Sequence, residues 1–170
     1  MELDALLRAL AATSVATTIR ENDALFPWVE ALHVLAITLV VGFISIVDLR
    51  LMGLASRDRA LKPLTGEVLP CVWAAFVVAA ISGLLLFSSN AVTYAHNSYF
   101  QLKFVFLALA GVNMAVFHLF VGRGIERWGA SPDTTPVRAR MVGAVSLLLW
   151  IGVITFGRWV GFTLMPTPAA

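Results

Sequence analysis

The stretch that decides the fold runs from Pro27 to Leu54 and reads PWVEALHVLAITLVVGFISIVDLRLMGL. It carries no charge from Val34 to Val47 and then ends in Asp48-Leu49-Arg50. About 20 apolar residues at roughly 1.5 Å each cross the roughly 30 Å hydrocarbon core of a bilayer, so the stretch predicts a transmembrane helix. Near its start lies His33, a titratable ring that is costly in lipid and is therefore a candidate functional residue. The structural alternative is a histidine that is hydrogen-bonded to a neighbouring carbonyl.

The composition places the whole chain in the membrane class. Of its 170 residues, 59% are hydrophobic and 13% are charged, whereas soluble domains are about 45 to 50% apolar. The formal net charge of +2 does not indicate a nucleic-acid partner, because eight of the twelve Lys and Arg residues lie in two short loops between apolar runs. The single cysteine, Cys71, excludes an intrachain disulfide and is predicted to be a small core residue.

We predict an all-α fold, namely an integral membrane four-helix bundle with a short N-terminal interfacial amphipathic helix. Residues 1–23 form the interfacial segment, because leucines recur at helical spacing there and acidic residues stand where a cleavable signal has basic ones. The four-helix transmembrane domain covers residues 24–165. Its predicted spans are about 27–47, 68–88, 101–121 and 140–163.

Capping residues and prolines suggest where these helices begin and end. Asp23 is a candidate N-cap for the first span, and Thr135 is one for the fourth. Pro70 is expected in the first turn of the second span. Pro166 and Pro168 are expected to stop the last helix.

The loops predict how the bundle is oriented. The loop at 89–100 carries no Lys or Arg. Eight basic residues follow the first and third spans, namely Arg50, Arg57, Arg59, Lys62, Arg123, Arg127, Arg138 and Arg140. By the positive-inside rule we expect a bacterial inner-membrane protein with both termini outward, in the periplasm.

Small residues recur every four positions on three of the spans. The stripes are Ala75, Ala79 and Gly83, then Gly111 and Ala115, then Gly157 and Gly161. Such stripes allow close packing between helices, including those of a homo-oligomer, or leave room for a flat cofactor. The spacing alone leaves both interpretations open.

Depth along the spans divides the polar side chains into two layers. His33 lies roughly 9 Å below the outer end of its span and His118 roughly 25 Å below the outer end of its own, so these two histidines are not expected to ligate one haem. The outer layer holds Glu30, His33, Lys103 and Arg158, with Tyr94 and His96 from the outer loop. The inner layer holds His118, Asn113 and Ser146, and Asp48, Arg50, Arg123 and Arg140 border it.

The outer layer has the residue types that bind a haem b. His33 would ligate the iron, while Lys103 and Arg158 would bind the propionates through charge-assisted hydrogen bonds. The opposite axial site would be open, or filled by a group such as His96 or Lys103. The structural alternative for Arg158 is an ion pair with Glu30. A copper or zinc site at His33 and His96 ranks lower, because such metals take two or more closely placed His, Cys or Met ligands.

The inner layer is assigned a structural role. We expect His118 to form a hydrogen bond with Ser146 or Asn113. The alternative is that His118 binds a second cofactor or a quinone.

Five segments carry a family resemblance: LFPWVEALHVLAITLVVGFISIVDLRLMG (25–53), LP (69–70), SGLLLF (82–87), YAHNSYFQLKF (94–104) and SLLLWIGVITFGRWVGF (146–162). Together they resemble a family of uncharacterised four-helix bacterial inner-membrane proteins. The layout is more distantly similar to the HemJ-type protoporphyrinogen oxidases and the CopD-like copper-resistance membrane proteins. The HemJ-type resemblance implies haem b and a functionally required His and Lys, at the positions of His33 and Lys103.

The sequence thus predicts a membrane redox protein that binds haem b or a related tetrapyrrole. If it is an enzyme, we expect an oxidoreductase that exchanges electrons with quinone or a porphyrin. The alternative is a non-catalytic membrane scaffold or oligomerising subunit without a cofactor.

Overall fold

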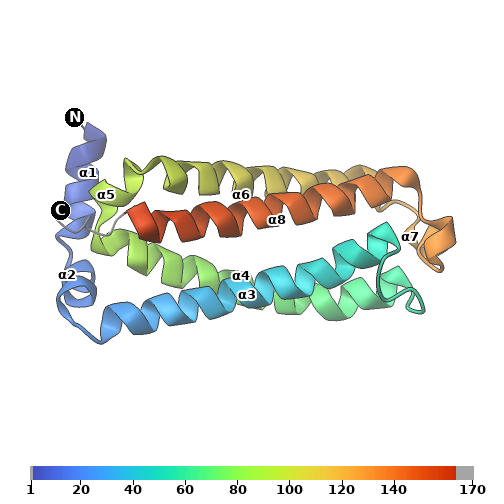
Figure 1. The fold of residues 1–170 in the computed structure, drawn as a ribbon, viewed down its shortest axis with the longest axis horizontal. Coiled ribbons are helices and arrows are strands. Elements are labelled where there is room, and N and C mark those ends of the chain that lie inside the picture. The colour runs from blue at the N-terminus through green and yellow to red at the C-terminus, as the bar shows by residue number, and fades with distance from the viewer. Residues whose placement is uncertain (1, 164–170) are drawn as a thin grey trace.

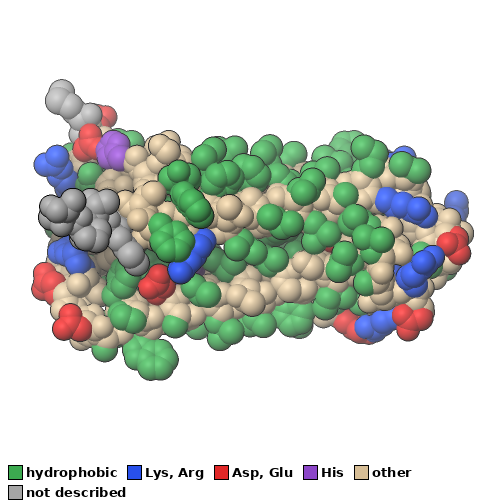
Figure 2. All heavy atoms as spheres, in the orientation of Figure 1, with side chains coloured by type: hydrophobic (Ala, Val, Ile, Leu, Met, Phe, Trp, Pro, Cys, Tyr) green, Lys and Arg blue, Asp and Glu red, His purple; other side chains and the backbone are tan. Residues whose placement is uncertain are grey.

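Four long antiparallel helices form the body of the protein in the computed structural model, which describes residues 2–163 (Figure 1). They are α3 (Leu25–Met52), α4 (Leu61–Ser89), α6 (Ser98–Val116, extended by the π-helix η1, Phe117–Val121) and α8 (Val137–Thr163). Each is long and apolar enough to cross a membrane. Figure 2 shows hydrophobic side chains along the middle of the bundle and charged ones toward its two ends. The chain is an all-α, multi-pass membrane protein.

The four helices pack as two antiparallel pairs. The most extensive packing joins α3 to α4 and α6 to α8, and α3 also packs on α8. Buried aliphatic residues concentrate where α3 ends and α4 begins, with Val47, Leu51, Leu61 and Leu64 in one cluster. Both cavities described below are lined by residues from all four spans.

The N-terminal segment differs from the prediction of one helix. Two helices, α1 (Glu2–Ala11) and α2 (Ser14–Glu21), lie across the end of the bundle (Figure 1). They are separated because the Thr13 hydroxyl accepts a hydrogen bond from the Ala16 N–H and so caps a new helix. Leu7 and Ile19 are buried, whereas Leu3 and Leu6 are exposed, which suits a segment at a membrane surface.

Several predicted helix ends were wrong. The side chain of Asn22, and not that of Asp23, accepts hydrogen bonds from the N–H groups of Ala24 and Leu25, where α3 begins. Helix α4 begins at Leu61, so Pro70 lies inside it and not in its first turn. The Thr135 hydroxyl donates to the Ser131 carbonyl and does not cap α8. Pro166 and Pro168 lie outside the described residues.

Short elements fill the loops between the spans. They are α5 (Ala91–Ala95) before α6, and α7 (Ile125–Trp128) with the 3₁₀-helix η2 (Pro132–Thr134) before α8. Lys62 of α4 forms a salt bridge with Glu126 of α7, and this hydrogen-bonded pair lowers the pKa of the Glu126 carboxyl. The pair links the first turn of α4 to α7 at the basic end of the bundle.

The close contacts between helices only partly follow the predicted stripes. Ala75 and Ala79 are buried, as close packing requires. Where α6 packs on α8, however, the Phe106 ring occupies the space that a Cβ on Gly152 would take, and Gly152 lies outside the predicted stripes. Gly161 has open space where a Cβ would lie. Cys71 is exposed on α4, so the prediction of a core cysteine was wrong.

Candidate functional site

A cavity of about 460 Å³ lies between the helix pairs, at the end of the bundle that carries α1 and α2. All four spans contribute to it, together with Tyr94 of α5. We call it the His33 cavity. Its polar lining consists mainly of residues that the sequence had placed in the outer layer, namely Glu30, His33, Tyr94, Lys103 and Arg158.

The imidazole of His33 is held by one of its two nitrogens. Its Nδ1 lies 2.9 Å from the Ala79 carbonyl oxygen and 3.1 Å from the Ser82 hydroxyl. A carbonyl only accepts, so Nδ1 carries the proton, and Ser82 donates its own proton to the Val78 carbonyl at 2.7 Å. The structural alternative predicted such a bond to a carbonyl, and it is present. It uses only Nδ1.

The Nε2 of His33 has no hydrogen-bond partner among residues 2–163. In the neutral ring this nitrogen is unprotonated and offers a lone pair. Histidines that ligate metals usually donate their other N–H to a carbonyl or a carboxylate, which fixes the tautomer and the ring orientation. His33 therefore has the arrangement of a ligand that is ready to bind.

Glycines from three of the spans line the same cavity. Beside Gly83, a Cβ would lie 2.8 Å from the Cε1 of His33, and beside Gly157 one would lie 3.5 Å from the Cδ of Lys103. A Cβ on Gly42 or Gly161 would meet no other described part of the chain within 4 Å, apart from the glycine's own chain neighbours and helix backbone. The first two glycines thus make room for the His33 and Lys103 side chains, and the other two leave open space.

The charged groups of the cavity have no hydrogen-bonding or oppositely charged partner within residues 2–163. Glu30, Lys103 and Arg158 form no salt bridge and no side-chain hydrogen bond with any described residue. The ion pair between Arg158 and Glu30, the structural alternative for Arg158, is therefore not formed. The Arg158 guanidinium instead lies 4.7 Å from the centre of the Phe162 ring. Two cationic side chains are thus available to a carboxylate from outside the chain.

Tyr94 of α5 forms part of an aromatic wall of the cavity. Its ring packs 5.6 Å from that of Phe100 and 6.4 Å from that of Phe87, measured between centroids. Burial raises the pKa of the Tyr94 phenol, and the negative charge of Glu30 raises it further. The phenol is therefore a neutral hydrogen-bonding group at physiological pH.

His96 does not belong to this site. Its side chain is 64% exposed, and its Nε2 lies 2.9 Å from a carboxylate oxygen of Asp4 in α1. The expectation that His96 reaches toward His33, as an axial ligand or as a second metal ligand, is wrong because the N-terminal helix holds it at the surface.

Residues 2–163 contain no group of three or more His, Cys, Asp or Glu side chains that would hold a metal ion. The expected pairing of His33 with His96 for copper or zinc is likewise not formed in this part of the chain.

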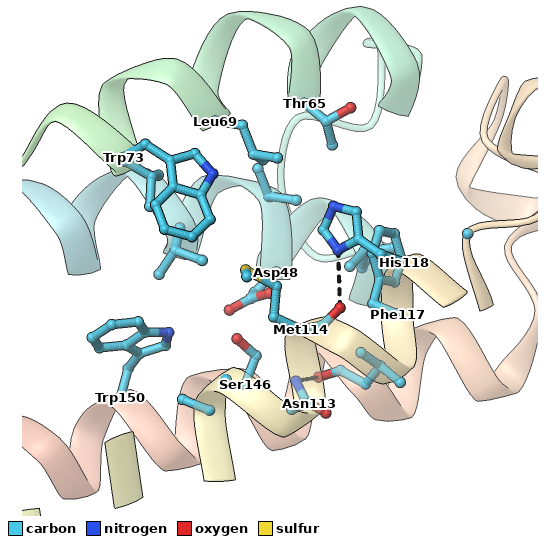
Figure 3. A pocket seen from close by; sticks show the side chains of 18 of the residues that line it. Asp48, Thr65, Leu69, Trp73, Asn113, Met114, Phe117, His118, Ser146 and Trp150 are labelled. Carbon is cyan, nitrogen blue, oxygen red and sulfur yellow. Dashed lines mark hydrogen bonds between the residues drawn. The ribbon is translucent and has the colours of Figure 1, made fainter. Parts of the chain in front are cut away.

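A second cavity, of about 670 Å³, lies toward the opposite end of the bundle (Figure 3). We call it the Asp48 cavity. Asp48, Asn113, His118 and Ser146 line it, so it corresponds to the predicted inner layer. His33 and His118 therefore face different cavities, in agreement with the argument from depth.

The polar groups of the Asp48 cavity are not bonded as predicted. The Nδ1–H of His118 donates to the Met114 carbonyl of its own helix at 2.9 Å (Figure 3), and the Asn113 amide donates to the Val142 carbonyl at 3.1 Å. His118 thus bonds to neither Ser146 nor Asn113. Asp48 is only 4% exposed, and its Oδ2 is buried with no hydrogen-bond partner in the described chain.

Arg50, a secondary site candidate from the sequence, binds loop carbonyls inside the protein. It is fully buried and donates to the carbonyls of Arg59 at 2.7 Å and Gly129 at 3.2 Å. It is not part of the lining of the Asp48 cavity.

Residues 11–163 match a family model described as a family of unknown function, DUF6644. No curated protein and no solved structure matches the chain. The matched range includes all four spans and both cavities.

Proposed function

The chain belongs to the DUF6644 family, and we propose that this member is a membrane redox protein that binds haem b, or a related tetrapyrrole, in the His33 cavity. His33 would supply the axial ligand through Nε2, and Lys103 and Arg158 would bind the carboxylates. Quinone or a porphyrin would be the electron partner. When bound, haem b supplies one-electron chemistry and, where an axial position is open, the binding of a small ligand.

The single observation that carries this proposal is the hydrogen bonding of His33. Its Nδ1–H is donated to the Ala79 carbonyl, while Nε2 has no partner among the described residues. If His33 served only to join α3 to α4, the single hydrogen bond to Ala79 would be sufficient, and the ring would not need to line a cavity. Here it lines a cavity that also holds Lys103 and Arg158, two cationic side chains that form no salt bridge with any described residue.

The size and the lining of the cavity fit a tetrapyrrole. Its volume of about 460 Å³ falls within the roughly 300 to 1,000 Å³ of small-molecule and cofactor sites. Gly42 and Gly161 leave open the space that side chains would fill. Apart from His33, the described residues of the lining include no His, Met or Cys, so His33 is the residue that would hold the haem iron.

The resemblance to the HemJ-type oxidases gives separate support. It singles out His33 and Lys103, which lie on different spans and line the same cavity. The porphyrin partner rests on this resemblance alone.

The proposed location is the bacterial inner membrane. Eight of the twelve basic residues lie at or near the loops that hold α7 and η2 and that join α3 to α4. The positive-inside rule places this end in the cytoplasm and the His33 cavity toward the periplasm.

A visible absorption spectrum of the purified full chain, expressed in cells supplied with haem precursor, tests the proposal. We expect a Soret band in the wild type and in His118→Ala, and its loss in His33→Ala. A colourless wild-type protein would contradict the proposal and favour the alternative of a scaffold without cofactor.

A matched pair of glycine variants tests where the cofactor sits. Gly161→Leu fills the His33 cavity and should lower haem content at least severalfold. Gly111→Leu fills the Asp48 cavity in the same way, because Gly111 also has no atom within 4 Å of its Cβ position, and it should leave haem content unchanged. The reverse result would place the cofactor in the other cavity.

A further inference from the structure

Asp48 has a buried carboxyl oxygen that accepts no hydrogen bond from any described residue. Its residue is 4% exposed, and Oδ2 is buried without a partner in the described chain. A buried polar atom that lacks a partner is costly and rare in folded proteins. Asp48 lines a cavity of about 670 Å³, which is large enough for a molecule that would supply the missing hydrogen bond.

The rest of that cavity selects for a flat, apolar molecule. Trp73 and Phe76 of α4, Phe117 of η1 and Trp150 of α8 line it, and aliphatic side chains make up most of the remainder. Figure 3 shows Asp48 and Ser146 between the two tryptophans and His118. The site therefore combines aromatic walls with a few polar atoms, the usual pattern of a ring-binding pocket.

We propose that the Asp48 cavity binds the ring of a lipid-soluble quinone or quinol. A quinol hydroxyl would donate to the Asp48 carboxyl group, and a protonated Asp48 would donate to a quinone carbonyl, so that one side chain recognises both forms. The choice of a quinone as ligand rests on the proposed redox function. Binding itself needs no haem, because the two cavities are lined by different residues.

Two other ligands of this cavity, a lipid acyl chain and a metal ion, can be distinguished from a quinone. A lipid acyl chain would fill the apolar space and leave Oδ2 without a partner, so Asp48 would not affect its binding. A metal ion would need several closely placed ligands, and the described residues hold no cluster of three His, Cys, Asp or Glu.

The test is a titration of the purified full chain in detergent with decylubiquinone, followed by quenching of tryptophan fluorescence, for which Trp73 and Trp150 are local reporters. We expect saturable quenching in the wild type. Asp48→Leu, which cannot form the hydrogen bond, should raise Kd about tenfold or more. Gly111→Leu, which removes the space and keeps the acid, should abolish saturable quenching even if Asp48→Leu fails to fold. His33→Ala should change Kd by less than about twofold.

Three outcomes would overturn the assignment. The first is an unchanged Kd in folded Asp48→Leu or in Gly111→Leu. The second is a loss of binding in His33→Ala alone, which would place the quinone in the other cavity. The third is equal binding of decylbenzene, which keeps the tail and a ring but lacks oxygen, because this would assign the space to lipid. Quinone binding by a chain without a Soret band would uphold this site and contradict the proposed haem function.

Discussion

A β-carbon on Gly83 would lie 2.8 Å from the Cε1 of His33, closer than real Cβ contacts come. The next nearest ring atom, Nδ1, would be 3.4 Å away. The His33 ring therefore occupies the space that the missing side chain leaves on α4. One turn earlier, the Ala79 carbonyl accepts the Nδ1–H, so the same helix both seats the ring and fixes its tautomer.

Gly83→Ala should therefore displace the imidazole without removing it. We expect haem content to fall at least severalfold while the protein remains folded, because alanine is a better helix former than glycine. The measurement is the ratio of the Soret band to protein absorbance, with helicity followed by circular dichroism. Gly66→Ala is the matched control, since it changes another glycine of α4 that has open space around its Cβ position. Equal haem content in the two variants would contradict the role of Gly83.

The cationic side chains at the cavity should act through their charge. Arg158→Leu should weaken haem retention by about tenfold, the scale of one charge-assisted hydrogen bond. Arg158→Lys should retain most of it. The rate of haem transfer to an excess of apomyoglobin measures retention in each variant. An unchanged rate in the leucine variant would remove Arg158 from the site, and it would leave Lys103 as the remaining cationic candidate.

The predictions that succeeded depended on properties that one helix carries by itself. Length and hydropathy located the four spans, and depth along a helix was sufficient to separate His33 from His118. Lys103 and Arg158 were grouped with His33 for the same reason, because antiparallel helices place residues of equal depth side by side.

The predictions that failed depended on contacts between distant segments. The position of His96 is set by Asp4, which lies on a helix that packs across the end of the bundle. No sequence spacing indicates that contact. The position of Asp48 near the end of the first span, two residues before Arg50, predicts a charged residue that borders the inner polar layer. In the structure both residues are buried, because the loop that holds Gly129 folds over Arg50 and the backbone of Asp48 packs closely against Gly143 of α8.

Tyr94 should titrate at unusually high pH. Burial and the charge of Glu30 raise its pKa above the ordinary value of about 10. The folded state therefore holds this proton more tightly than the unfolded state does, so its contribution to stability is complete below about pH 10 and is lost as the pH rises toward the folded pKa. The chain has two tyrosines, so Tyr99→Phe leaves Tyr94 as the only one, and tyrosinate absorbance reports it directly. Adding Glu30→Gln to Tyr99→Phe should lower the pH at the midpoint of the Tyr94 titration. A midpoint at or below about pH 10 in Tyr99→Phe alone would contradict the effect of burial.

Arg50 should matter for folding and not for the cofactor. Its guanidinium is fully buried and donates to the carbonyls of Arg59 and Gly129, which ties the end of α3 to both loops at the basic end of the bundle. Arg50→Leu removes both donors, and we expect the free energy of unfolding to fall by about 2 kcal/mol or more.

Arg57→Leu is the matched control, because Arg57 forms an exposed pair with Asp133 at 3.6 Å, and such pairs contribute less than about 1 kcal/mol. Thermal unfolding of both variants in detergent gives the comparison. Any Arg50→Leu protein that folds should keep the wild-type ratio of haem to protein, since the His33 cavity lies toward the other end of the helices. Equal stability of the two variants would show that the buried guanidinium contributes no more than a surface charge.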